Sequence, residues 1–341
     1  MGGLPPLPAQ PRDVAWPTRD WPTGAPAVRD RARLDGLLAR AFDAPAEGPL
    51  GKTYALLAVQ GGRLTFERYG FGATAESTQP SWSMAKSMTQ ALVGMLALDG
   101  RLDVAAPADV PEWQAPGDPR AAITTDQLLR MSSGLAFVED YVPGSVSDVL
   151  EMLYGSGKAD TAAYAAGRPL AHPPGTFWSY ASGTTNIVAR LAAKAHGGDF
   201  AAYMRERLFQ PLGMTSATPK FDAVGTFIGS SFCFCTPRDF ARFGLLYLRD
   251  GVWEGRRLLP EGWVDYARTP TFQQAGVTDA YGAHWWLGLG GPGSFSANGY
   301  AGQFIVVCPE RDLIVVRNGD TPLEAKDALR AWMAEAVDCF G

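Results

Sequence analysis

The chain has 341 residues, a net charge of −5 and a pI near 5.3, and 46% of its residues are hydrophobic. This length allows a sizeable core in one large or two closely packed domains. The acidic balance and the lack of a basic tract argue against nucleic acid or an anionic membrane surface as the main partner. No apolar run is long enough to span a bilayer, and residues 1–11 lack the features of a signal peptide. We therefore expect a cytoplasmic protein.

The first 100 residues show three kinds of pattern. Residues 1–27 are rich in Pro and predict an extended arm, packed on the body by Trp16 and Trp21. Apolar residues at helical spacing follow from Leu34 to Phe42. Two apolar stretches, 54–60 and 63–69, then flank Gly61-Gly62 and predict a β-hairpin.

Beyond the hairpin, helical patterns dominate until about residue 268, and strand patterns return near the end. The predicted helices cover residues 83–98, 146–153, 160–166, 184–196, 200–209, 237–248 and 323–337, and the predicted late strands cover 284–289, 303–308 and 313–317. We therefore expect an α/β domain built from 28–100 and 270–341, interrupted by a mainly α-helical domain at 101–269. The oligomeric state stays open, with a homodimer among the possibilities.

The candidate chemistry lies in Ser83-Met84-Ala85-Lys86, an S-x-x-K motif at the start of a predicted apolar helix. Residues three apart share one helix face, so the amine of Lys86 can reach the hydroxyl of Ser83. The positive potential of a helix N-terminus favours the alkoxide, and burial together with that potential lowers the pKa of a lysine. A neutral Lys86 could then accept the proton of Ser83.

The motif alone is weak evidence, because chance yields roughly 0.3 matches in a chain of this composition. The alternative is a helix-capping Ser83 followed by a solvated Lys86. The helix continues as an almost wholly apolar run to Gly100, which makes an ordinary surface position for Lys86 less plausible.

Two further segments could complete such a site. Tyr180 stands in a loop before a helix, where a phenol close to cationic groups would have a lowered pKa and could shuttle a proton. The segment Ala297-Asn298-Gly299-Tyr300 enters a late strand, where a backbone N–H can serve as an oxyanion donor. The alternatives are a packed loop aromatic and a bend in an edge strand.

Metal chemistry is not expected. Cys233, Cys235, Cys308 and Cys339 are irregularly placed, and we expect buried free thiols. The three histidines form no cluster, and neither a metal nor another cofactor is expected.

Taken together, the S-x-x-K motif, Tyr180-Ala-Ser182 and Ala297-Asn298-Gly299 resemble the serine β-lactamase and penicillin-binding-protein superfamily. The resemblance is to the branch of class C β-lactamases, family VIII-type carboxylesterases and 6-aminohexanoate-dimer hydrolase, and it covers about residues 53–319. It implies a β-lactamase/transpeptidase-like α/β fold, in which helices flank an antiparallel sheet and an all-α domain is inserted. Glu139-Asp140-Tyr141 and Tyr300-Ala-Gly-Gln303 also resemble segments of the nylon-oligomer hydrolase.

The resemblance implies a role for each residue. Ser83 would be the nucleophile, Lys86 the general base and Tyr180 the group that passes the proton to the leaving group. The N–H groups of Ser83 and Tyr300 would form the oxyanion hole, and Tyr141 would line the substrate pocket. A serine hydrolase acting on small esters or linear amides is therefore expected.

Two departures lower the expectation of efficient β-lactam hydrolysis. Ala297 replaces the cation that in β-lactamases helps to bind the substrate carboxylate, and Ser182 replaces the Asn of the Tyr-x-Asn element. A β-lactamase, a β-lactam or peptidoglycan-fragment binding protein with slow deacylation, and a catalytically inactive scaffold stay open as alternatives.

Overall fold

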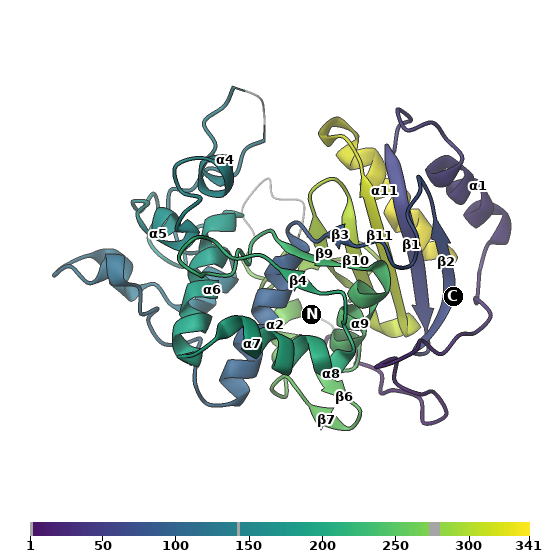
Figure 1. Cartoon of the computed structure of the whole chain (residues 1–341), viewed down its shortest axis with the longest axis horizontal. Coiled ribbons are helices and arrows are strands. Elements are labelled where there is room, and N and C mark those ends of the chain that lie inside the picture. The colour runs from purple at the N-terminus through teal and green to yellow at the C-terminus, as the bar shows by residue number, and fades with distance from the viewer. Residues whose placement is uncertain (1–2, 142–143, 273–279) are drawn as a thin grey trace.

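The protein is described by a computed structural model that covers residues 3–141, 144–272 and 280–341. Its central element is an antiparallel sheet in the order β2-β1-β11-β10-β9-β8, so strands from both ends of the chain lie side by side (Figure 1). These strands are β1 (Lys52–Gln60), β2 (Arg63–Tyr69), β8 (Trp286–Leu287), β9 (Phe295–Gly299), β10 (Gln303–Cys308) and β11 (Leu313–Asp320). The fold is therefore a β-lactamase/transpeptidase-like α/β fold, as expected.

The predicted hairpin is confirmed as β1 and β2. Gly61 and Gly62 have φ values of 55° and 74°, the left-handed backbone that a two-residue turn between twisted strands requires. Residues with side chains would adopt both angles only at a cost.

Helices cover both faces of the sheet. Alternate residues of each strand point to opposite sides, and apolar side chains occur on both, so both faces have to be shielded from water. On one face, α1 (Arg31–Phe42) and α11 (Lys326–Cys339) pack over Leu56 and its neighbours. On the other face, α2 (Met84–Leu98) and α9 (Pro237–Leu248) pack over Leu57 and its neighbours. The sheet thus separates two apolar layers.

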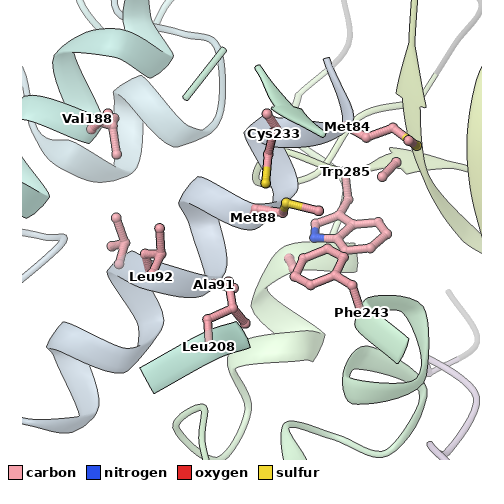
Figure 2. Close-up of a cluster of buried hydrophobic side chains, with 14 of the residues drawn as sticks. Met84, Met88, Ala91, Leu92, Val188, Leu208, Cys233, Phe243 and Trp285 are labelled. Carbon is pink, nitrogen blue, oxygen red and sulfur yellow. The ribbon is translucent and has the colours of Figure 1, made fainter. Parts of the chain in front are cut away.

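Helix α2 is the centre of the larger layer, and every residue from Met84 to Leu96 is buried. Figure 2 shows Met88, Ala91 and Leu92 among side chains from several other elements. The labelled neighbours are Val188, Leu208, Cys233, Phe243 and Trp285. A helix surrounded in this way must be apolar on all sides, which explains its sequence.

The remaining helices lie mostly beside α2, away from the sheet (Figure 1). They are α3 (Thr125–Leu129), α4 (Asp148–Tyr154), α5 (Thr161–Ala166), α6 (Ser182–His196), α7 (Phe200–Met204), α8 (Gln210–Leu212) and α10 (Trp263–Arg268), with a π-helical turn at Arg205–Phe209 and 3₁₀ turns at Pro111–Trp113, Pro119–Ala122, Pro309–Arg311 and Leu323–Ala325. The short strands are β3 (Gln79–Pro80), β4 (Thr218–Pro219), β5 (Cys233–Cys235), β6 (Val252–Trp253) and β7 (Arg256–Arg257). Helix α9 lies within 101–269 yet packs on the sheet, and the predicted division into domains stays a prediction.

Two strand expectations near the C-terminus need correction. The expected strand at 284–289 is only Trp286–Leu287, because His284 has a φ of 58° and its ring contacts the carbonyl of Leu129. The segment Phe295–Gly299 forms a separate strand, β9, before β10 begins at Gln303. Its short polar residues have low β-propensity, which concealed it.

The N-terminal arm is attached to the body by its two indoles, as expected. Trp16 packs against Trp253 with ring centroids 4.9 Å apart, and the guanidinium of Arg242 lies over Trp21. Arg242 also donates a hydrogen bond to the carbonyl of Pro17, at 2.7 Å. Across the described part of the chain, none of the helices combines the length and apolar character needed to cross a bilayer.

We expect Leu92→Ala to lower the free energy of unfolding by about 2–5 kcal/mol, because it leaves a cavity beside fully buried neighbours. Urea denaturation followed by circular dichroism measures this loss. Leu98→Ala on the same helix is the matched control, because Leu98 is 41% exposed and its truncation should change the free energy by only about 0.5 kcal/mol. Equal losses in the two variants would contradict the central position of α2.

Candidate active site

The start of α2 is held in place by Ser81. Its N–H donates to the carbonyl of Cys233 at 3.2 Å, and its Oγ accepts from the N–H of Cys233 at 2.9 Å. Trp82 follows with a φ of 43°, an unfavourable conformation for a residue with a bulky side chain. This turn brings Ser83 to the N-cap position of the helix, at the edge of a cavity. Strained backbone of this kind clusters at functional sites.

Lys86 lies one turn along α2 and is only 1% exposed. Its Nζ is 2.9 Å from Ser83 Oγ, 3.0 Å from Ser182 Oγ and 3.0 Å from the carbonyl oxygen of Ser230. Burial lowers the pKa of Lys86 to about 8, and the negative charge of Glu139 opposes part of this change. Above about pH 8 the amine is therefore mostly neutral and able to accept a proton.

Tyr180 comes from the loop before α6 and lies against the same pair. The Nζ of Lys86 is 4.8 Å from the centre of its ring, and Ser83 lies close enough to the phenol to act on its pKa. The structure thus brings Ser83, Lys86 and Tyr180 together.

The expectation that Tyr180 has a lowered pKa is wrong. Loss of hydration raises the pKa of this phenol, the charge of Glu139 raises it further, and the nearby hydroxyl of Ser83 opposes these two effects only in part. Tyr180 is therefore a neutral phenol at physiological pH, so it holds a proton that it can donate.

Tyr141 and Tyr300 lie side by side on the wall of the cavity, with ring centroids 5.3 Å apart. Trp82 contacts Tyr300 edge-on, at 5.5 Å between centroids. Trp286 lines the cavity next to Tyr180. The cavity has a volume of about 370 Å³, which suits a small-molecule ligand.

The turn that carries Tyr300 is fixed by the buried guanidinium of Arg317. Its Nη1 donates to the carbonyl of Gly302 at 2.7 Å, and Ala301 has a φ of 58°. Among hydrogen bonds between the described residues, neither the N–H of Ser83 nor that of Tyr300 donates to a protein group. Both stay candidates for the oxyanion hole.

Glu139 is the site residue that sequence reasoning missed, although its segment was noticed. Its carboxylate accepts hydrogen bonds from the N–H and Oγ of Ser182 and from the hydroxyl of Tyr141, each at 2.7 Å. Ser182 begins α6, and its preceding residue Ala181 has no side chain that could cap the helix. Glu139 supplies this cap from 43 residues upstream, so no local sequence pattern could reveal it.

The two departures from the β-lactamase pattern have different surroundings. Ala297 is buried in β9, whereas Ser182 Oγ bridges Lys86 and Glu139. The cations that line the cavity, Lys326 and Arg330, come instead from α11. The part of the chain described here contains no cluster of three side chains suited to hold a metal.

Comparisons with known proteins agree with this geometry. The family model described as Beta-lactamase matches residues 38–338. A 6-aminohexanoate-dimer hydrolase from Paenarthrobacter ureafaciens is 28% identical over 326 residues, covering 88% of this chain and 83% of the relative.

Two solved structures share the fold. A protein from Bacillus anthracis, provisionally assigned as a 6-aminohexanoate-dimer hydrolase, has a TM-score of 0.76 at 22% identity, covering 97% of this chain and 89% of the other. The unliganded simvastatin synthase from Aspergillus terreus has a TM-score of 0.70 at 16% identity, covering 91% of this chain and 98% of the other. With a family model that spans most of its length, the chain belongs to the β-lactamase family and is a hydrolase of the β-lactamase superfamily.

Proposed function

We propose that the protein is a serine hydrolase that forms an acyl-enzyme on Ser83 and hydrolyses small esters or linear amides. The observation that carries this proposal is the 2.9 Å contact between Ser83 Oγ and the buried Nζ of Lys86. An amine whose pKa lies near 8 can deprotonate a serine, which an ordinary surface lysine does only poorly.

The remaining groups supply the other steps of acyl transfer. Lys86 takes the proton as Ser83 Oγ attacks the substrate carbonyl, and the N–H groups of Ser83 and Tyr300 stabilise the oxyanion. Tyr180, a neutral phenol, donates its proton to the leaving group and regains one from Lys86. A water then attacks the carbonyl carbon of the ester on Ser83 and loses a proton to neutral Lys86. Lys86 returns this proton to Ser83 Oγ as the bond between Oγ and the acyl carbon breaks and the acid is released.

The lining of the cavity favours a linear substrate with an anionic end. Aromatic rings of Tyr141, Tyr300 and Trp286 surround the space near Ser83, and Lys326 and Arg330 lie on its α11 side. An aliphatic amide or ester with a terminal carboxylate matches this order of apolar and cationic surface. The name of the Paenarthrobacter relative, which is a hydrolase of the 6-aminohexanoate dimer, agrees with such a substrate.

We expect Ser83→Ala to lower the turnover of p-nitrophenyl acetate by at least about 10³-fold, because the nucleophile is removed. The absorbance of released p-nitrophenolate, followed over time, measures the rate, and circular dichroism checks that the variant is folded. Ser156→Ala, at an exposed serine just after the end of α4, is the matched control and should keep the original rate. Turnover by Ser83→Ala at the rate of the unaltered protein would remove Ser83 as nucleophile.

We expect kcat/KM for the same ester to rise with pH and to level off above a midpoint near pH 8. The pKa of Lys86 is lowered to about 8, so the ammonium, which cannot accept a proton, predominates below that pH. Well below the midpoint the rate should fall about tenfold for each pH unit. Because the pKa of Tyr180 is raised, no decline is expected within the usual titration range of a phenol.

The measurement is a kcat/KM profile from about pH 6 to about pH 10, with the Ser83→Ala protein as the blank for spontaneous ester hydrolysis. A flat profile over this range would contradict Lys86 as the general base.

A β-lactam-binding protein with slow deacylation is the second candidate, since it needs the same Ser83–Lys86 pair. The absence of a charge at Ala297 disfavours it, because the strand beside the nucleophile has no cation there. We therefore expect intact-protein mass spectrometry after exposure to benzylpenicillin to find no lasting adduct. A stable adduct on Ser83, absent from Ser83→Ala, would favour the binding protein.

A further inference from the structure

Glu139 determines which atom donates and which accepts in the hydrogen bonds around Lys86. The ionised carboxylate of Glu139 can only accept hydrogen bonds. Ser182 Oγ lies 2.7 Å from Glu139 Oε1, so its single proton is committed to that oxygen. Ser182 can then only accept from Lys86 Nζ, 3.0 Å away.

The carbonyl of Ser230 is the second group that can only accept from Lys86, at 3.0 Å. A neutral lysine amine has two protons and one lone pair. Its two protons are taken by Ser182 Oγ and the Ser230 carbonyl. The lone pair is then left for the third partner of the nitrogen, the hydroxyl of Ser83 at 2.9 Å.

We propose that Glu139 is a positioning residue, which directs the lone pair of neutral Lys86 at Ser83 by fixing the direction of the Lys86–Ser182 hydrogen bond. The proposal deepens the serine-hydrolase function above and rests on it. The logic is that of a carboxylate that selects the productive form of a catalytic base without touching substrate.

The proton transfer balances on these partners. As the bond from Ser83 Oγ to the substrate carbonyl carbon forms, its O–H bond breaks and the proton moves to Lys86. The resulting ammonium has three protons facing Ser83 Oγ, Ser182 Oγ and the Ser230 carbonyl. The negative charge of Glu139 stabilises the ammonium through Ser182 until the proton leaves by way of Tyr180.

A direct role for Glu139 as counter-ion of a substrate ammonium fits the contacts less well. Its Oε1 already accepts from Ser182 Oγ and from the hydroxyl of Tyr141, and its Oε2 accepts from the N–H of Ser182. These three short bonds use most of the accepting capacity of the carboxylate within the protein.

The other titratable groups around Lys86 do not compete with this role. His284, before β8, is buried with a pKa lowered to about 3 and is therefore neutral. Tyr180 before α6, Tyr281 before β8 and Tyr141 after α3 all have pKa values raised by burial, so they are neutral as well. Glu139 is the negative charge that acts on the pKa of Lys86 from within the described residues.

The test compares Glu139→Gln with the unaltered protein in p-nitrophenyl acetate hydrolysis as a function of pH. An amide can donate to Ser182 Oγ, which frees the Ser182 proton to occupy the lone pair of Lys86. We expect kcat to fall by about 10–100-fold with little change in KM, a part of what general base catalysis contributes. Loss of the negative charge should also move the midpoint of the pH profile to lower pH.

Two variants separate this role from a structural one. Glu76→Gln removes a carboxylate from an exposed loop and controls for net charge, so it should keep both rate and midpoint. Ser182→Ala keeps the charge of Glu139 but removes the bridge, so kcat should fall while the midpoint moves less. A Glu139→Gln protein with the original kcat and midpoint, or with a lower kcat and an unmoved midpoint, would overturn the proposal.

A measurement without substrate tests the role of Glu139 separately from the hydrolase activity. The chain has six lysines, and ¹³C-lysine NMR with Lys86→Arg for assignment follows the titration of Lys86 directly. A lower titration midpoint in Glu139→Gln supports the coupling even if no ester is turned over, whereas an identical midpoint refutes it. Failure of the hydrolase function would appear separately, as a lack of Ser83-dependent turnover.

Discussion

The site depends on an amine that is buried and that, among the described residues, has no carboxylate in direct contact. Within this part of the chain, the Nζ of Lys86 contacts the hydroxyls of Ser83 and Ser182 and the carbonyl of Ser230. The negative charge of Glu139 acts on it from beyond Ser182, whose hydroxyl donates to that carboxylate. A direct ion pair would hold the lysine in its charged form, and a fully apolar pocket would leave its protons unsatisfied. The observed arrangement does neither, because neutral acceptors satisfy the protons and a distant charge limits the lowering of the pKa.

Burial of such a group requires a rigid frame, and the fold provides it. Helix α2 is surrounded on all sides, so its first turn cannot rotate to expose Lys86. The Ser81–Cys233 hydrogen bonds attach the start of the helix to β5, and Arg317 fixes the turn beside Tyr300. Ser83, the proposed nucleophile, and the N–H of Tyr300, a candidate oxyanion donor, are therefore held by separate elements that meet at one cavity, which is the arrangement that acyl transfer needs.

Local patterns were sufficient for much of this molecule. The hairpin at Gly61-Gly62, the helix with Ser83 and Lys86 on one face, and helix α9 depend on residues close in sequence. Strand β9 escaped detection because its short polar residues are held by pairing with β8 and β10 rather than by their own preference.

Properties that arise between distant segments could not be predicted in the same way. Tyr180 was found as a residue, but the direction of its pKa shift depends on burial and on a carboxylate 41 positions away. Glu139 and the carbonyl of Ser230 lie on loops whose own sequences contain no catalytic pattern. Which group donates and which accepts in a hydrogen-bond network depends on all the partners that meet in the folded protein. A sequence does not show which of its distant segments will supply those partners.

The pairing of β1 with β11 has a consequence for how the protein is made. Register partners such as Leu57 and Val316 are separated by most of the chain, so β1 leaves the ribosome long before its neighbour exists. Until then its edge is open and the apolar underside of α2 has no sheet to cover it, a state in which nascent chains aggregate and recruit chaperones. A chain truncated before β11 would contain Ser83, Lys86 and Tyr180 but would be inactive. The sheet that holds these residues in place is completed only by the last strands to be translated.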